Sequence, residues 1–154
     1  MGLIDKKLAE LGIVLPVPMK PVANYVPWVK TGNLVFISGQ GAMVDGKVHY
    51  HGKLGDTVTI EDGIASARLT AINILAQLRE ACDGDLDRVA RIVKLVGFVS
   101  AVPDFIDHPK IINGASDLMA QVFGDKGRHA RSAVGVPSLP LNFSVEIDAV
   151  VEIA

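Results

Sequence analysis

The feature that most limits the fold of this chain is a strict alternation of apolar and polar side chains over residues 142–149. Successive side chains of a strand point to opposite faces of a sheet, so a period of two predicts a β-strand. One face would carry Phe143, Val145, Ile147, Ala149 and Val151, and the other Asn142, Ser144, Glu146 and Asp148. Such a strand needs a sheet with one face on a core and a polar face toward solvent, a cleft or another subunit.

Two segments have the spacing of amphipathic helices. The first covers residues 60–83, with Thr59 as the expected N-cap and Gly84 at its end. The second covers residues 110–123, and Gly124 is expected to close it. Between the two helices, residues 92–101 are largely apolar on both faces, which is typical of a central, buried strand.

Shorter elements complete the order. They are a helix over residues 3–11, a hairpin of 25–30 and 34–38 around the turn 31–33, a strand over 47–51 and a strand over 131–136. Residues 38–41 are expected to break the second hairpin strand. The order predicts an α+β fold, a single mixed sheet with both long helices on one face. We expect one domain over residues 1–154, with 1–20 as an N-terminal extension, and a neighbouring subunit covering the other sheet face.

Charge and cysteine content limit the partners and the compartment. The net charge is −2 and the basic residues form no run, which argues against a general nucleic-acid binder. No apolar stretch reaches the length of a membrane-spanning helix without interruption, so no membrane partner is expected. The charged start is not typical of a signal peptide, and the lone Cys82 cannot form an internal disulfide. We therefore expect a cytoplasmic protein.

Most familiar catalytic motifs are missing from the sequence. It has no phosphate-binding loop, no complete dinucleotide fingerprint and no cysteine pair. His49 and His51 would share one face of a strand, but no third ligand accompanies them, so we interpret them as solvated histidines and expect no metal. Cys82 falls on the apolar stripe of the first long helix and is interpreted as a buried structural thiol.

Arg131 and Glu146 are the remaining polar residues of interest. They lie on two predicted strands joined by a short bend, and if these strands pair, the two side chains would lie close together. An arginine offers a planar fork of donors for a carboxylate, and a nearby glutamate could orient it or handle a proton or a water molecule. The alternative is a cross-strand salt bridge without a function, which contributes little at a surface.

Three blocks resemble the reactive-intermediate (enamine/imine) deaminase family, also known as the liver perchloric-acid-soluble endoribonuclease family. They are residues 25–40 (YVPWVKTGNLVFISGQ), residues 86–95 (LDRVARIVKL), and residues 130–136 (ARSAVGV) followed by Leu139-Pro140 and 145–149 (VEIDA). The resemblance implies a chorismate-mutase-like fold and a homotrimer with a barrel-like core and clefts between subunits. It also implies hydrolysis of 2-imino and 2-enamino acids to 2-keto acids and ammonia, without a metal or an organic cofactor.

The resemblance also assigns residues. Arg131 matches the arginine that binds the carboxylate of a small substrate, and Glu146 the glutamate of the water or proton step. The substrate-binding positions that it implies are Tyr25, Ser38, Gly39 and Ala133.

This chain departs from the family pattern at several positions. Ala133 stands where the family often has a cysteine, Asn113 lies near the position of a family asparagine, and the segment 51–57 points to a longer subgroup. Two alternatives to the deaminase stay open, a non-catalytic trimer that binds keto acids, and a ribonuclease. The acidic net charge argues against the ribonuclease.

Overall fold

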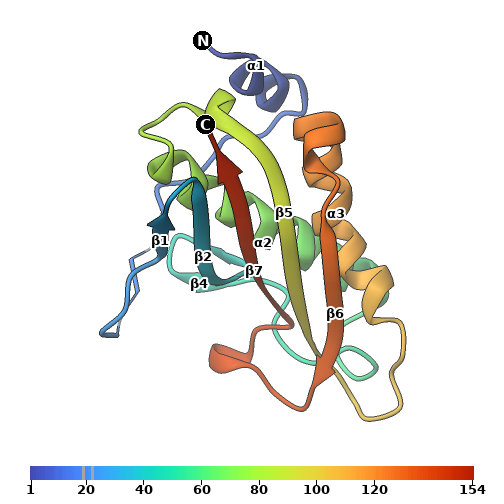
Figure 1. Ribbon diagram of the computed structural model, residues 1–154. Coiled ribbons are helices and arrows are strands. Elements are labelled where there is room, and N and C mark those ends of the chain that lie inside the picture. The colour runs from blue at the N-terminus through green and yellow to red at the C-terminus, as the bar shows by residue number, and fades with distance from the viewer. Residues whose placement is uncertain (19, 22) are drawn as a thin grey trace.

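The chain folds around a five-stranded mixed sheet (Figure 1). The computed structural model describes residues 1–18, 20–21 and 23–154. The strands are β1 (Trp28–Thr31), β2 (Leu34–Gly41), β5 (Val89–Ser100), β6 (Ala130–Val136) and β7 (Val145–Ile153), in the spatial order β1-β2-β7-β5-β6. β5 and β6 are parallel, and every other neighbouring pair is antiparallel. The predicted α+β class with a mixed sheet is therefore confirmed.

The two long helices, α2 (Ile60–Ala81) and α3 (His108–Phe123), pack against each other and cover one face of the sheet, as predicted (Figure 1). Their apolar stripes supply much of the core, and Leu75, Leu78, Ile111 and Leu118 have no exposed surface. Burying a side chain of this size contributes about 1.5–3 kcal/mol. The core therefore lies between this helical layer and the inward face of the sheet. No helix of the described residues is long and apolar enough to cross a membrane.

The helix ends follow the predicted signals. Thr59 caps α2, because its hydroxyl accepts a hydrogen bond from the Asp62 amide at 3.1 Å. Beyond the other end of α2, Gly84 has a φ of +89°, a left-handed conformation that favours glycine. Gly124, with a φ of +62°, ends α3.

The predicted hairpin forms between β1 and β2, but the break expected over residues 38–41 was wrong. β2 continues to Gly41, and a register shift against β7 between Ile37 and Gln40 absorbs the irregular segment as a bulge. The predicted strand over 47–51 is shorter. β4 (Lys47–Val48) pairs only with β3 (Met43–Val44), and Tyr50 has a φ of +55°, so the alternation does not reach His51.

The possible pairing of the strands that carry Arg131 and Glu146 does not occur, because β5 lies between β6 and β7. The reason is the connection through α3, which returns the chain parallel to β5 and places β6 at the sheet edge. β7 lies between β2 and β5, and its burial alternates because the helices cover only one face of the sheet. Ser144 departs from the predicted polar face, since it is buried and its hydroxyl lies 2.8 Å from that of Ser66.

The short N-terminal helix α1 (Leu3–Glu10) is attached to the domain by a carboxylate from outside the helix. Asp87 accepts hydrogen bonds from the amides of Leu3 and Ile4, each at 2.9 Å, and so takes the place of a local N-cap. The amides of Ile4 and Leu3 lower the pKa of Asp87 because they stabilise its charged form. Arg79 on α2 adds an ion pair to Asp5 at 3.3 Å.

We expect Asp87→Ala to loosen α1 while leaving the sheet intact, because the first amides of the helix lose their acceptor. Hydrogen–deuterium exchange should become faster in residues 3–10 and stay unchanged in β5. Because the folded-state pKa is lowered, this attachment is present above the pKa of the unfolded chain and is lost as the pH falls through the folded value. Asp104→Asn, at another exposed carboxylate, serves as the control. Unchanged exchange in residues 3–10 of the Asp87 variant would contradict the assignment.

Candidate functional site

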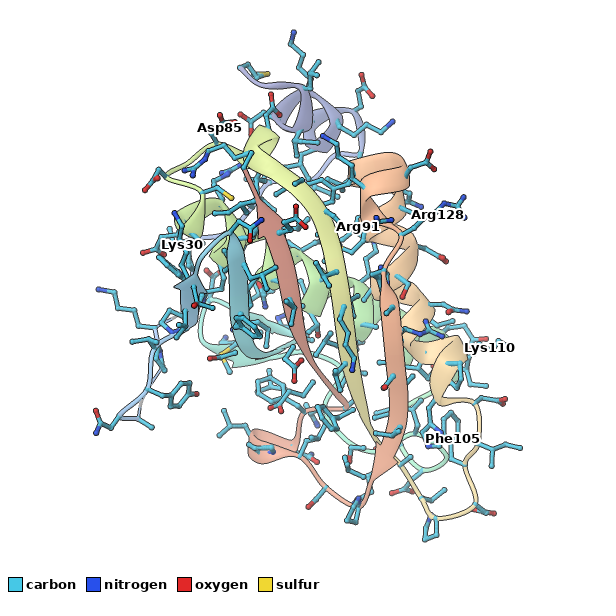
Figure 2. The ribbon with its side chains drawn as sticks, in the orientation of Figure 1. Lys30, Asp85, Arg91, Phe105, Lys110 and Arg128 are labelled. Atoms are coloured by element: carbon cyan, nitrogen blue, oxygen red, sulfur yellow. The ribbon has the colours of Figure 1, made fainter. Side chains whose placement is uncertain are left out.

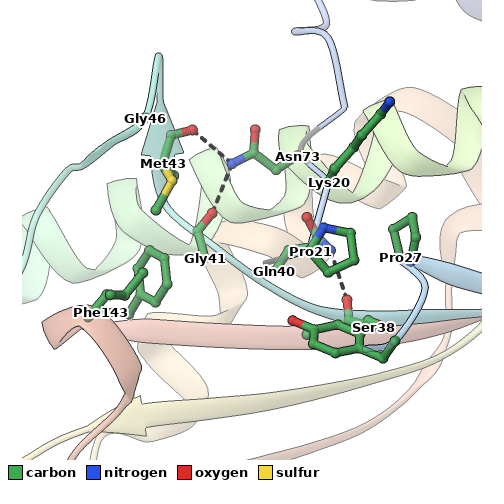
Figure 3. Close-up of a pocket in the computed structure, with 13 residues that line it drawn as sticks. Lys20, Pro21, Pro27, Ser38, Gln40, Gly41, Met43, Gly46, Asn73 and Phe143 are labelled. Atoms are coloured by element: carbon green, nitrogen blue, oxygen red, sulfur yellow. Dashed lines mark hydrogen bonds between the residues drawn. The ribbon is translucent and has the colours of Figure 1, made fainter. Parts of the chain in front are cut away.

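A pocket of about 360 Å³ opens beside the bulged end of β2 (Figure 3). Three predicted substrate-binding residues, Tyr25, Ser38 and Gly39, belong to its lining. The other lining residues are Lys20, Pro21, Pro27, Gln40, Gly41, Met43, Gly46, Asn73, Leu141 and Phe143. The walls are therefore mostly apolar, with a few polar groups.

Hydrogen bonds to the bulge hold the segment that carries Tyr25. The Ser38 hydroxyl donates to the carbonyl oxygen of Val26 at 2.8 Å, and the Ser38 amide donates to that of Pro27 at 2.9 Å. The Gln40 side-chain amide donates to the Ser38 carbonyl at 3.0 Å. Ser38 therefore fixes the backbone on which Tyr25 sits, and the Tyr25 side chain stays 56% exposed at the mouth of the pocket.

Glu146 reaches the same region from β7. Its neighbours Val145 and Ile147 are fully buried toward the helices, so Glu146 points to the opposite, open face of the sheet. A Cβ atom added at Gly39 would lie 3.0 Å from the carboxyl carbon of Glu146, so the glycine leaves the space that this carboxyl group occupies. Among the described residues, Glu146 does not line the pocket itself, but it lies against Gly39, which does, and we call Tyr25, Ser38, Gly39 and Glu146 the carboxyl half-site.

Partial burial raises the pKa of Glu146, and the negative charge of Asp148 raises it further. Burial also raises the pKa of Asp148, against the opposing effect of Lys94. Both acids lie on the open face of β7. Glu146 can therefore hold a proton closer to neutral pH than an ordinary glutamate, which suits proton transfer.

Asn73 on α2 is a pocket residue that the sequence reasoning did not identify. Its side-chain amide donates to the carbonyl oxygens of Gly41 at 2.8 Å and Met43 at 3.0 Å, and so ties the end of β2 to α2 (Figure 3). It is only 7% exposed. A buried amide inside a helix whose neighbours are apolar was the signal that could have indicated it.

Arg131 lies in a different place, on β6 against α3. Its Nη1 donates to the Oδ1 of Asn113 at 2.7 Å and to the Oγ of Ser116 at 3.2 Å. These two acceptors are three residues apart on α3 and therefore share one side of the helix. Sequence reasoning left Asn113 unassigned and missed Ser116. The pair did not stand out in the sequence, because α3 also carries Lys110, Asp117 and Gln121.

The remaining donors of Arg131, Nε and Nη2, are suited to binding a carboxylate. Within the part of the chain that the structure describes, Nη1 makes all of the side-chain hydrogen bonds of Arg131. Nε and Nη2 form the parallel pair of donors that can grip a carboxylate at two points. Ala133, two residues further along β6, shares the side of the strand occupied by Arg131. We call Arg131, Asn113, Ser116 and Ala133 the guanidinium half-site.

The two half-sites are separate within one subunit. Arg131 points toward α3 and Glu146 toward the open face, and β5 stands between their strands. Two strand spacings alone amount to about 10 Å. The six predicted residues therefore divide into four in the carboxyl half-site and two in the guanidinium half-site.

His49 and His51 are both exposed. Over residues 1–18, 20–21 and 23–154, no group of three or more His, Cys, Asp or Glu side chains could hold a metal ion.

We expect Asp148→Asn to lower the pKa of Glu146, because the variant removes one of the two causes of its upward shift. The pKa should stay above that of an ordinary glutamate, since burial is the larger cause. A ¹³C NMR titration of the side-chain carboxyl group measures this directly, and Glu152→Gln, near the far end of the same strand, is the control. A Glu146 pKa that does not move in the Asp148 variant would contradict the proposed coupling.

Comparisons with known proteins show which family this chain resembles. A family model described as "YjgF/chorismate_mutase-like, putative endoribonuclease" matches residues 5–153. Protein TCP17 of Trypanosoma cruzi is 44% identical over 153 residues, which cover 99% of this chain and 95% of that protein. The crystal structure of Atu1372, a protein of unknown function from Agrobacterium tumefaciens, superposes with a TM-score of 0.92 at 50% identity, over 98% of this chain and 92% of that one.

A more distant relative carries the name of an activity. The 2-iminobutanoate/2-iminopropanoate deaminase of Dermatophagoides farinae is 28% identical over 141 residues, which cover 92% of this chain and 94% of that protein. The fold agrees with these similarities, and the resemblance stated from the sequence is confirmed. The chain belongs to the YjgF family of chorismate-mutase-like proteins, which includes imine deaminases.

Proposed function

We propose that this protein hydrolyses 2-imino and 2-enamino acids to 2-keto acids and ammonia, in clefts that two subunits complete. The observation that carries the proposal is Arg131, held through Nη1 and open at Nε and Nη2. The Dermatophagoides farinae relative named as an imine deaminase supports the same reaction.

The guanidinium half-site suits the carboxylate of the substrate. Charge-assisted, two-point hydrogen bonds from arginine to a carboxylate fix both the position and the plane of the ligand. Asn113 and Ser116 hold the opposite side of the guanidinium group, so little conformational freedom is lost on binding.

The carboxyl half-site can supply the proton transfers that hydrolysis of the C=N bond requires. Protonation of the imine nitrogen makes the carbon electrophilic, water adds to it, and the resulting amino alcohol loses ammonia to leave the C=O bond. Glu146, with its raised pKa, can give a proton to nitrogen and take one from the attacking water. Imines of this kind are already reactive, so positioning and proton transfer are sufficient chemistry.

Assembly into a ring would bring the half-sites together. Tyr25 precedes β1 at one edge of the sheet, whereas Arg131 lies on β6 at the other edge (Figure 1). Contact between two different surfaces of identical subunits generates closed rings when the rotation permits. The open face also carries exposed Val29, Phe36 and Val134, which a neighbour would cover. We propose that the ring is a homotrimer, the smallest closed arrangement beyond a dimer.

We expect Arg131→Ala to lower kcat/KM for imine hydrolysis by about 10- to 100-fold, the range for losing hydrogen bonds to a charged group. An amino-acid oxidase would generate the imino acid in the assay, and semicarbazide would trap what remains. Arg131→Lys should recover little, because an ammonium group does not offer the planar fork. Arg128→Ala is the matched control, since Arg128 is exposed and, among the described residues, forms an ion pair with Asp125 alone, at 3.5 Å.

Two outcomes would change the proposed function or the proposed role of Arg131. Wild-type protein that binds 2-keto acids in calorimetry but does not accelerate imine decay would indicate a binding protein without turnover. Undiminished hydrolysis by Arg131→Ala would remove Arg131 from the site.

A cleft shared by two subunits predicts that two inactive variants restore one another. Co-expression of Arg131→Ala with Glu146→Gln should yield mixed rings, in which an intact Arg131 from one chain meets an intact Glu146 from its neighbour. Random mixing at equal amounts would restore about one quarter of the clefts in a ring. Light scattering checks that each variant still assembles. Activity no higher than the sum of the separate variants would contradict the shared cleft.

A further inference from the structure

Two residues beyond Arg131 continue its hydrogen bonds into the protein. The Ser116 hydroxyl oxygen lies 2.9 Å from Nε2 of His129, and Nδ1 of His129 lies 2.7 Å from the carbonyl oxygen of Gly127. His129 comes just before β6, two residues from Arg131 along the chain. The proposed function uses Ser116 only as one of two acceptors that hold Arg131, and it gives His129 no role.

The direction of every hydrogen bond in this series can be deduced. A carbonyl oxygen only accepts, so Nδ1 of His129 must carry the hydrogen that reaches Gly127. In neutral histidine, Nε2 is then an acceptor, and the Ser116 hydroxyl must donate to it. The oxygen of Ser116 is left to accept from Nη1 of Arg131. The donors therefore run in one direction from Arg131 through Ser116 and His129 to Gly127.

This order has a consequence for the guanidinium group. The two hydrogens of Nη1 lie in the guanidinium plane, and one goes to Asn113 while the other goes to Ser116. Two acceptors in fixed positions therefore set the plane as well as the position, and with it the direction in which Nε and Nη2 point. A hydroxyl group without a fixed acceptor for its hydrogen could rotate and so vary the direction of the lone pairs that Arg131 meets. His129 removes that ambiguity.

Arg128, the residue before His129, takes no part in this series of hydrogen bonds among the described residues. Arg128 projects outward beyond the end of α3 (Figure 2), and its side chain is 78% exposed. His129 is half-buried in the opposite direction. Burial lowers the pKa of His129 and so does the charge of Arg131, while the hydrogen bond to Gly127 opposes them. Among the described residues, Arg131 is the charged group that shifts the pKa of His129. Burial and this charge both favour the neutral ring.

We propose that Ser116 and His129 are positioning residues that set the orientation of the Arg131 guanidinium group for the substrate carboxylate. This inference rests on the proposed function, because it assumes that Arg131 anchors the ligand. It implies that affinity for the carboxylate depends on groups that never touch the substrate.

Steady-state kinetics and calorimetry with a 2-keto acid test the role. We expect Ser116→Ala and His129→Leu each to raise KM and Kd by about tenfold with a much smaller change in kcat, as for the loss of roughly one hydrogen bond of ground-state binding. The double variant should be no worse than Ser116→Ala alone, because both changes break the same series. Ser116→Thr, which keeps the hydroxyl group, should restore most of the affinity. Asp117→Asn, at the adjacent exposed residue of α3, is the control for α3.

The imidazole ¹⁵N chemical shifts test the hydrogen-bond order without any reference to activity. We expect the neutral Nδ1–H tautomer of His129 in the wild type, and a shift of the Nε2 resonance in Ser116→Ala. The Nε2–H tautomer would overturn the inference. Wild-type binding together with an unchanged Kd in Ser116→Ala would also overturn it, and would leave the proposed function intact. A wild type that neither binds keto acids nor hydrolyses imines would overturn both.

Discussion

The parallel pairing of β5 with β6 is the constraint on which the arrangement of the site depends. Parallel neighbours cannot be joined by a tight turn, so the chain must cross the sheet through α3. The crossover leaves β6 at the edge and brings α3 beside it, where Asn113 and Ser116 meet Arg131. The other side of β5 pairs with β7, whose pleat turns Glu146 to the opposite face. One pairing choice thus separates the guanidinium and carboxyl groups.

That separation explains why this small chain leaves so much of its sheet uncovered. α2 and α3 cover one face, and the other face carries apolar side chains, among them Phe36 and Val134, each 44% exposed. In the proposed ring, the contact that buries these side chains is also the contact that completes the cleft. Assembly and catalysis would then draw on the same surface, and a subunit alone would hold neither a covered sheet nor a complete site.

The sequence predicted what depends on local periodicity and missed what depends on the order of strands. The stripes of α2 and α3, the Thr59 cap and the alternation of β7 follow from side chains a few residues apart, and these predictions were confirmed. The strands that carry Arg131 and Glu146 could have paired but do not, because closeness along the chain does not determine which strands are neighbours. The hydrogen-bond partners of Ser116 and Asn73 could not be predicted for a related reason, because these partners are distant in sequence.

Each half-site can exist in a folded subunit before assembly, because the cost of burying its charged group is reduced within that subunit. An unpaired buried charge is expensive, and Glu146 avoids that cost by holding its proton to higher pH. Arg131 always keeps its charge, so it needs acceptors instead, and Asn113 and Ser116 provide them without using Nε and Nη2. The protein therefore holds a fixed donor fork on the edge strand β6 and an acid with a raised pKa on the open face of the central strand β7. A substrate that carries both a carboxylate and a C=N bond is the kind of ligand that needs both groups at once.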